Sequence, residues 1–192
     1  MKTGIIVIVI AAILVLFGCG KYNSLVTKDE GVKEKWGIVQ SSYQRRADLI
    51  PNLVATVKGA ANFETETLEK VIQARASATQ IKVDAADLTP EKLQQYQQAQ
   101  GQLGAALGRL LAVSENYPEL KANANFQNLQ AQLEGTENRI NVARNDFNGA
   151  VKEYNSAIRT FPNNIIAGIA GFKQKPYFEA NAGSENAPQV KF

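Results

Sequence analysis

The chain has 192 residues, 45% apolar and 20% charged, with a formal net charge of +3. This length and composition predict one folded domain with appendages. Lys and Arg are interspersed with Asp and Glu, which argues against nucleic-acid binding. Because the chain has no histidine and one cysteine, His/Cys zinc sites, histidine-dependent catalytic triads, Glu-x-x-His di-iron ligation and a disulfide framework are excluded. No phosphate-binding or dinucleotide-binding glycine motif is present either. We expect no cofactor and no metal, and an enzyme would have to use carboxylates, Lys, Arg and hydroxyls.

The first part of the chain has the composition of a membrane anchor. Residues 5–17 are an uninterrupted apolar run, and with the neighbouring glycines and Cys19 the run covers residues 4–20. That length is about the minimum for a helix that crosses a bilayer. Lys2 precedes the run, and Lys21 and Tyr22 follow it, as is typical of the membrane interface. We therefore assign residues 1–21 to a membrane anchor.

Two kinds of anchor fit these residues. One is an uncleaved transmembrane helix continuous with the first helix of the folded domain, with Cys19 as a small apolar residue within it. The other is a bacterial lipoprotein signal, because residues 16–19 (LFGC) resemble a lipobox in which Cys19 would be acylated. Acylation would place the body outside the cytoplasm. The positive-inside rule leans toward a cytoplasmic body, because the lysines after the run outnumber Lys2 before it. The side of the membrane stays open.

The stretch 43–59 (YQRRADLIPNLVATVKG) contains a proline inside a helical pattern. Residues spaced alternately by three and four positions predict the first helix, and this seam comprises Val32, Trp36, Val39, Tyr43, Arg46, Ile50, Leu53 and Val57. Arg46 occupies a seam position where an apolar residue would normally lie. Because the seam keeps its register across Pro51, we predict one long helix kinked there, continuous with the anchor, in which the Ala47 carbonyl loses its partner. The cluster Arg45, Arg46, Asp48, Pro51 and Asn52 is a candidate interaction site beside that carbonyl. The favoured alternative is a kink satisfied by local side chains.

Three further helices are predicted after short links. The second has Leu68, Val71, Ile72, Arg75 and Ala78 on one face, which is apolar except for the arginine. The third begins at Thr89-Pro90-Glu91 as N-cap, first-turn proline and first-turn acid, with a seam at Leu93, Tyr96, Gln100, Leu103, Leu107 and Leu110. The fourth has Phe126, Leu129, Leu133, Thr136, Ile140, Ala143, Phe147, Ala150, Tyr154, Ala157 and Phe161 in step before Pro162. No segment has the period of a strand. The fold class is all-α, an antiparallel up-down-up-down four-helix bundle over residues 22–179, with a flexible tail at 180–192.

Polar residues interrupt three of these seams at similar distances from the turns at the end of the bundle farther from the anchor. Counting residues from those turns, near Gly59, Ser114 and Lys121, places Arg46, Gln100 and Thr136 at one level of an antiparallel bundle. We predict a polar core layer there, with Ser77 or Thr79 nearby and Glu137 or Glu134 as the acid that neutralises Arg46, since an unpaired buried guanidinium is costly. The alternative is that Arg46 extends past its neighbours to solvent.

The same topology returns the end of the fourth helix to the membrane side. Residues 164–172 (NIIAGIAGF) are apolar and lead into lysines and aromatics. This mixture suits the headgroup region, and the alternative is that it caps the open end of the bundle.

Several long motifs resemble the LemA family of bacterial membrane proteins. They are residues 22–26 (YNSLV), residues 32–36 (VKEKW), residues 43–59 and residues 139–179. The resemblance implies a membrane-anchored antiparallel helical bundle and supplies no catalytic residues. We expect a non-enzymatic, membrane-tethered scaffold that binds a protein partner or copies of itself. The alternatives are a ligand-binding protein or enzyme using the Arg45 to Asn52 region, and an envelope lipoprotein acylated at Cys19.

Overall fold

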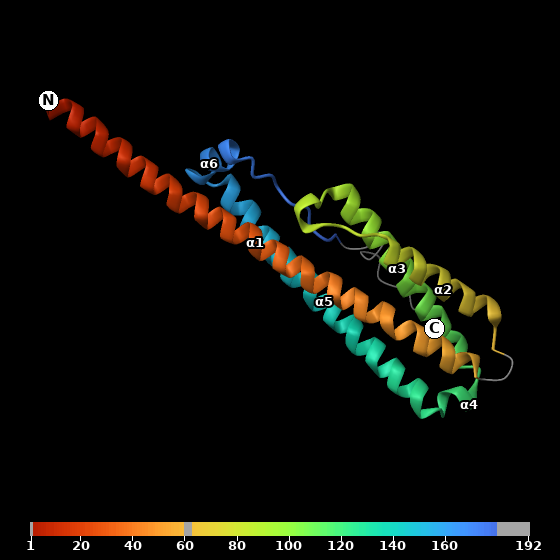
Figure 1. The fold of residues 1–192 in the computed structure, drawn as a ribbon. Helices are drawn as coiled ribbons and strands as arrows, with labels where there is room; N and C mark the ends of the chain where they lie inside the picture. Colours follow the sequence, from red (N-terminus) through yellow and green to blue (C-terminus); the bar gives the residue numbers. More distant parts are fainter. Residues whose placement is uncertain (1, 60–62, 180–192) are drawn as a thin grey trace, which may run out of the picture.

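The computed structural model describes residues 2–59 and 63–179 (Figure 1). Every regular element in those ranges is helical and none is a strand, which confirms the all-α prediction. The helices are α1 (Lys2–Lys58), α2 (Thr65–Gln80), the short 3-10 helix η1 (Ala85–Asp87), α3 (Pro90–Ser114), α4 (Pro118–Lys121), α5 (Ala124–Arg159) and α6 (Asn163–Ala170). The predicted tail at 180–192 lies outside the described residues.

Helix α1 joins the apolar segment to the body without a break. It has 57 residues and continues through Pro51. Among the described helices it is the one long and apolar enough to cross a membrane, judged by length and composition. Side chains described within the apolar run, such as Ile8 and Leu16, are exposed, whereas Leu25, Val32 and Trp36 further along are buried.

The body consists of helices packed side by side. α1 packs along α5, α2 packs along α3, and α1 also contacts α2 (Figure 1). One hydrophobic cluster includes Trp36, Tyr96 and Phe147. A second cluster, toward the far end, includes Leu53, Leu103 and Phe126. Both clusters draw residues from α1, α3 and α5.

The predicted start of the third helix is confirmed. The Thr89 side chain accepts a hydrogen bond from the Lys92 backbone N–H at 3.3 Å, and Pro90 is the first helical residue. This cap satisfies one of the backbone donors that a helix start leaves free.

Two predicted core positions are wrong. Ile72 is exposed, because the buried stripe of α2 runs through Leu68, Val71 and Ala78 and Ile72 lies one position off it. Phe161 is 76% exposed, because α5 ends at Arg159. The seam also drifts over the last turns of α5, where Val151 and Ile158 are buried while Ala150 and Ala157 are only partly so. A straight helix has 3.6 residues per turn, so a strict seven-residue count falls out of phase over a long helix.

An extended segment after α6 runs back along α5 and is held by two asparagines. The Asn155 side chain donates to the Lys175 carbonyl at 2.8 Å and accepts from the Lys175 N–H at 2.9 Å. Asn148 makes the same pair of bonds with Phe178, at 3.0 and 2.8 Å. Seven helical residues rise about 10.5 Å and three extended residues span about 10 Å, so the two pairs match. Phe178 is thereby placed against Trp36, with ring centroids 5.9 Å apart.

Candidate functional site

A groove of about 550 Å³ lies between α3 and α5, with residues of α1 also lining it. Gly101, Gly104 and Gly108 contribute no side chains along the α3 wall. A Cβ added at Gly101 or Gly108 would meet nothing within 4 Å, so these positions are open. Sequence reasoning does not find this groove, because residue types alone do not show which face of a helix lacks a packed neighbour.

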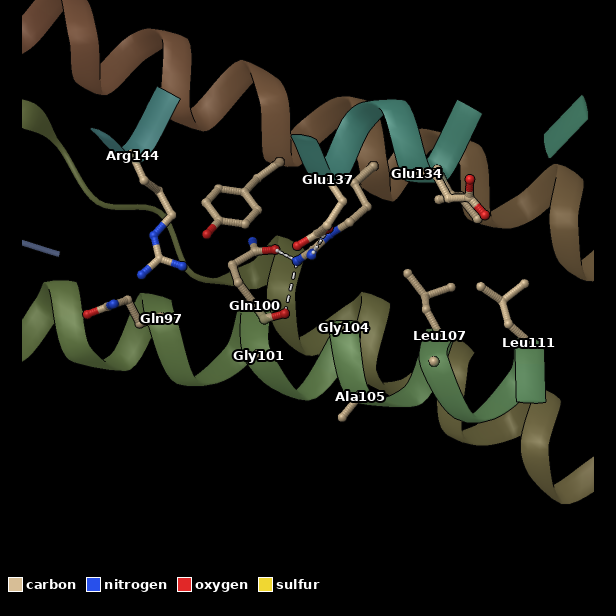
Figure 2. A pocket seen from close by; sticks show the side chains of 14 residues that line it. Gln97, Gln100, Gly101, Gly104, Ala105, Leu107, Leu111, Glu134, Glu137 and Arg144 are labelled. Carbon is tan, nitrogen blue, oxygen red and sulfur yellow. Dashed lines mark hydrogen bonds and ion pairs between the residues drawn. The ribbon is translucent and has the colours of Figure 1, made fainter. Parts of the chain in front are cut away.

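Arg46 extends from α1 into this groove and is 3% exposed. Its Nη1 donates to Glu137 Oε2 at 2.9 Å, and its Nη2 donates to the Gln100 side-chain and backbone oxygens at 2.8 and 2.9 Å (Figure 2). Its guanidinium carbon also lies 5.0 Å from the centre of the Tyr43 ring. The ion pair is half-buried, since the Glu137 side chain is 51% exposed. The structure thus brings together Arg46, Gln100 and Glu137 from three helices.

The other residues expected in the polar layer make no side-chain bond to Arg46 among the described contacts. Thr136 is buried, but its hydroxyl donates to the Gln132 carbonyl of its own helix at 2.7 Å. Ser77 and Thr79 are exposed, and α2 contributes the Ala78 carbonyl instead, which accepts a bond from Gln100 Nε2 at 3.4 Å. A backbone oxygen thus takes the place expected for a hydroxyl.

The end of the groove nearer the anchor is formed around Arg144, which the sequence did not single out. Arg144 extends from α5 toward α3, where Gln97 lies (Figure 2). Its Nη2 donates to the Glu179 carbonyl at 3.1 Å, and its guanidinium carbon lies 4.9 Å from the centre of the Phe178 ring. Burial raises the pKa of Tyr43, which also lines the groove, above the ordinary tyrosine range, so its hydroxyl stays protonated and can donate. The groove is therefore apolar around Leu107 and polar toward Arg144.

The candidate cluster on α1 is divided by the structure. Arg46 lies in the groove, whereas Arg45, Asp48, Pro51 and Asn52 are exposed and line none of the grooves described.

The carbonyl that Pro51 leaves without its helical partner is occupied from the neighbouring helix. Arg75 Nε of α2 donates to the Ala47 oxygen at 2.8 Å. The alternative expected local side chains to satisfy this carbonyl, and the side chain that does so comes from the neighbouring helix instead. The Ala47 carbonyl therefore already has a donor.

Two other features bear on chemistry. Cys19 is exposed on α1. Within the described residues no group of three or more His, Cys, Asp or Glu side chains is arranged to hold a metal ion. The carboxylates that line the α3–α5 groove are Glu134 and Glu137, and Glu137 already pairs with Arg46. The lining of the groove combines glycine backbone, leucine side chains and two arginines.

These features define an all-helical protein with one apolar helical segment of membrane-spanning length and a groove along its body. The chain belongs to the LemA family, whose sequence model matches residues 35–192. This confirms the resemblance found in the motifs. The match begins after the apolar run of α1.

Named relatives add to this assignment. Magnetosome protein MamQ 1 of Paramagnetospirillum magneticum is 30% identical over 180 residues, which cover 83% of this chain and 65% of that protein. Protein LemA of Metamycoplasma hominis is 26% identical over 84% of this chain and 70% of its own length. Magnetosome protein MamQ of Magnetospirillum gryphiswaldense is 27% identical over 88% of this chain and 70% of its own length. The chain thus spans somewhat less than two thirds of the first of these relatives.

Proposed function

We propose that this protein is a non-enzymatic scaffold, tethered to a membrane through residues 4–20, that binds a helix of a partner protein in the α3–α5 groove. As part of this proposal, the four long helices form one antiparallel, up-down-up-down bundle. The observation that carries it is the glycine face of α3 along a groove of about 550 Å³, which is open at Gly101 and Gly108. Small residues let another helix backbone approach closely.

The charges of the groove also suit a polypeptide. Arg46 and Arg144 are balanced by Glu134 and Glu137 within one lining. A surface with both signs of charge and a leucine-bearing apolar part resembles the mixed character of protein interfaces. The support for a non-enzymatic role is the lack of histidine in the sequence and the use of Glu137 in a structural ion pair.

Filling the groove tests this proposal. A Cβ at Gly108 meets nothing within 4 Å, so Gly108→Leu should fold normally and project a side chain into the groove. Replacing glycine inside a helix should also raise stability, by roughly 0.5–1 kcal/mol. We expect full-length protein with this change to lose the partner that the unchanged protein retains in detergent extracts of native membranes.

The matched control is Gly135→Leu on α5. Its Cβ likewise meets nothing within 4 Å, and Gly135 is not among the residues that line the groove. This variant should keep the partner. Retention of the same partner by Gly108→Leu, or loss in both variants, would rule out the groove as the binding surface. Detection of catalytic turnover by the purified chain would rule out the non-enzymatic role.

A small-ligand site is a second candidate, supported by one observation. Among the described residues, no acceptor reaches the buried Nε of Arg46, although both terminal nitrogens of that side chain are bonded. A buried donor without a partner is costly, and a ligand acceptor would relieve that cost. Binding of a small anion that disappears in both Arg46→Met and Gly108→Leu, with no protein partner retained, would favour this candidate.

The type of anchor is tested separately. Acylation at Cys19 would require the side chain to be accessible, and it is exposed. Loss of lipid labelling in Cys19→Ser would identify the protein as an envelope lipoprotein. Equal membrane retention of Cys19→Ser and the unchanged protein, with no label in either, would identify an uncleaved transmembrane helix.

A further inference from the structure

Large apolar side chains that face solvent gather at one end of the molecule. Outside α1, the more exposed of them include Phe161, Ile165 and Ile169, which are 76%, 54% and 85% exposed. Ile165 and Ile169 are one turn apart on α6 and therefore lie on one face. We call these three residues the α6 patch. Other strongly exposed apolar side chains of the body, such as Val142 on α5, occur singly, and single exposures need no partner.

The patch lies level with the end of the apolar run of α1. Lys28 Nζ of α1 is 3.3 Å from Glu153 Oε2 of α5, which fixes the register of the two antiparallel helices. Thr160 caps α5 seven residues beyond Glu153, so it lies about 10 Å nearer the anchor, level with Lys21. Figure 1 shows α6 beside α1 at the end of the body from which the anchor segment projects.

The orientation of α6 is held by contacts on its opposite side. Ala167 is 3% exposed and belongs to the core cluster. Gly171 adopts φ +77°, a left-handed conformation that favours glycine, and the Phe172 N–H bonds the Ala167 carbonyl at 3.0 Å. This turn directs Phe172 onto Tyr22 of α1, with ring centroids 5.8 Å apart. Because α6 is fixed on α1 in this way, the patch keeps its outward direction.

The surroundings of the patch identify a lipid surface as its occupant. Phe17 of α1 is exposed one turn beyond Lys21 on the anchor side, and Lys21 lies over that ring with its Nζ 5.2 Å from the ring centre. Lysines and aromatic rings together at the end of an apolar helix are typical of the membrane interface. If residues 4–20 span the bilayer, α6 lies at headgroup depth, where apolar side chains are stabilised by the acyl boundary.

We propose that Phe161, Ile165 and Ile169 form a membrane-contact patch that inserts into the headgroup–acyl boundary beside α1. The inference rests on the proposed membrane tether. Anchor and patch together would make two attachments to one bilayer, and this fixes the inclination of the body rather than leaving it free on a single stalk.

A fluorescent probe at Ile169 tests the patch. Cys19 is the single cysteine of the chain. The membrane-spanning helix of residues 4–20, on which this inference rests, does not need its thiol, so Cys19→Ser provides a background in which one new cysteine can be labelled. Full-length Ile169→Cys in that background is labelled with an environment-sensitive dye and placed in nanodiscs that hold one copy. We expect blue-shifted emission, loss of most of that emission when the lipids carry a doxyl quencher, and protection from aqueous iodide. Val142→Cys, also exposed, should show none of these effects.

A third probe position separates failure of the patch from failure of the tether. Ile13→Cys reports on the apolar run itself. Quenching at position 13 but not at 169 would overturn the patch and leave the tether standing, whereas no quenching at either position would overturn both. A blue shift at 169 without doxyl quenching would mean that protein covers the patch, and a shift that needs two copies in one disc would identify a second copy of this chain. Either result would overturn lipid contact.

Discussion

Arg75 of α2 donates a hydrogen bond to the carbonyl of Ala47 on α1, the oxygen that Pro51 leaves without a helical partner. The bond joins two helices at the point where one of them has a defect. It is 2.8 Å long, and Arg75 is half-buried, so the contact is not a loose surface interaction. The proline that weakens α1 thereby creates an acceptor that attaches α2.

This relationship predicts that Pro51 and Arg75 are energetically coupled. Pro51→Ala restores an N–H for the Ala47 carbonyl and removes a ring that clashes with the helix, so it should stabilise the protein by roughly 1–3 kcal/mol. Arg75→Met keeps much of the apolar stem and should cost about 1 kcal/mol in the unchanged background. In the Pro51→Ala background that cost should fall to about half, because the oxygen keeps a partner.

The measurement for this pair is urea unfolding of the four proteins of the cycle, followed by far-UV circular dichroism in one detergent. Arg109→Met, on α3, is the matched control and should behave additively with Pro51→Ala. Additivity of Arg75→Met with Pro51→Ala would show that the bond contributes no coupling.

A second prediction concerns the ion pair in the groove. Glu137→Gln leaves the buried Arg46 guanidinium without a charged partner and should cost roughly 1–3 kcal/mol, reduced from the fully buried case because Glu137 is half exposed. Arg46→Met should cost less, because Glu137 can turn to water while methionine fills the apolar space. Thermal unfolding measures both. Glu134→Gln, whose carboxylate accepts a bond from Gln130, should be near neutral, and a larger loss in Arg46→Met than in Glu137→Gln would contradict this reasoning.

A third prediction gives the pH dependence of the contact that holds the C-terminal segment to α1. Asp29 lies 3.0 Å from both Lys175 Nζ and Lys33 Nζ. Burial raises the pKa of its carboxyl, but the bonds from Lys175 and Lys33 outweigh burial, and the net pKa is lowered. A lowered folded-state pKa means that the stabilisation is complete above the unfolded value of about 4 and is lost as pH falls through the folded value.

Asp29→Asn should therefore destabilise the protein at neutral pH by about 1 kcal/mol and remove part of the stability loss below about pH 4. Urea midpoints measured across pH check both effects. Glu115→Gln, which removes an exposed carboxylate paired with Lys121, serves as control and should leave the acid profile almost unchanged. Parallel acid profiles for Asp29→Asn and the unchanged protein would exclude Asp29 as the titrating group.

Much of the helical layout could be predicted because burial follows spacing. Tyr43, Leu103 and Ile140 occupy seams in threes and fours, and all three are buried. Counting residues from the distal turns placed Arg46 level with Gln100, and these side chains are bonded in the structure. Both inferences use only the rise of a helix and the alternation of its direction, which are regular quantities.

The groove and the extended segment follow no such regularity. Gly108 lowers helix propensity wherever it faces, so its type does not reveal that it borders an open space. Asparagine is a residue type that is mostly exposed in proteins, so its presence at positions 148 and 155 does not indicate a buried partner. The role of Asn148 and Asn155 depends on a segment thirty and twenty residues away in sequence. Arg144 gave no signal because its partners are a backbone carbonyl and a ring brought in by that same segment.

The last prediction tests the asparagine contacts through the single tryptophan of the chain. Asn148→Asp replaces the donor to the Phe178 carbonyl with a carboxylate oxygen, so one bond becomes a repulsion. Phe178 should then withdraw from Trp36, and the tryptophan emission should shift to the red. Amide exchange at Phe178 should quicken by about tenfold or more, since one lost bond is worth about 1 kcal/mol and the repulsion adds to that. Asn145→Asp, on the exposed side of the same helix, should change neither signal. An unshifted Trp36 spectrum with unchanged exchange in Asn148→Asp would show that aromatic packing alone holds the segment in place.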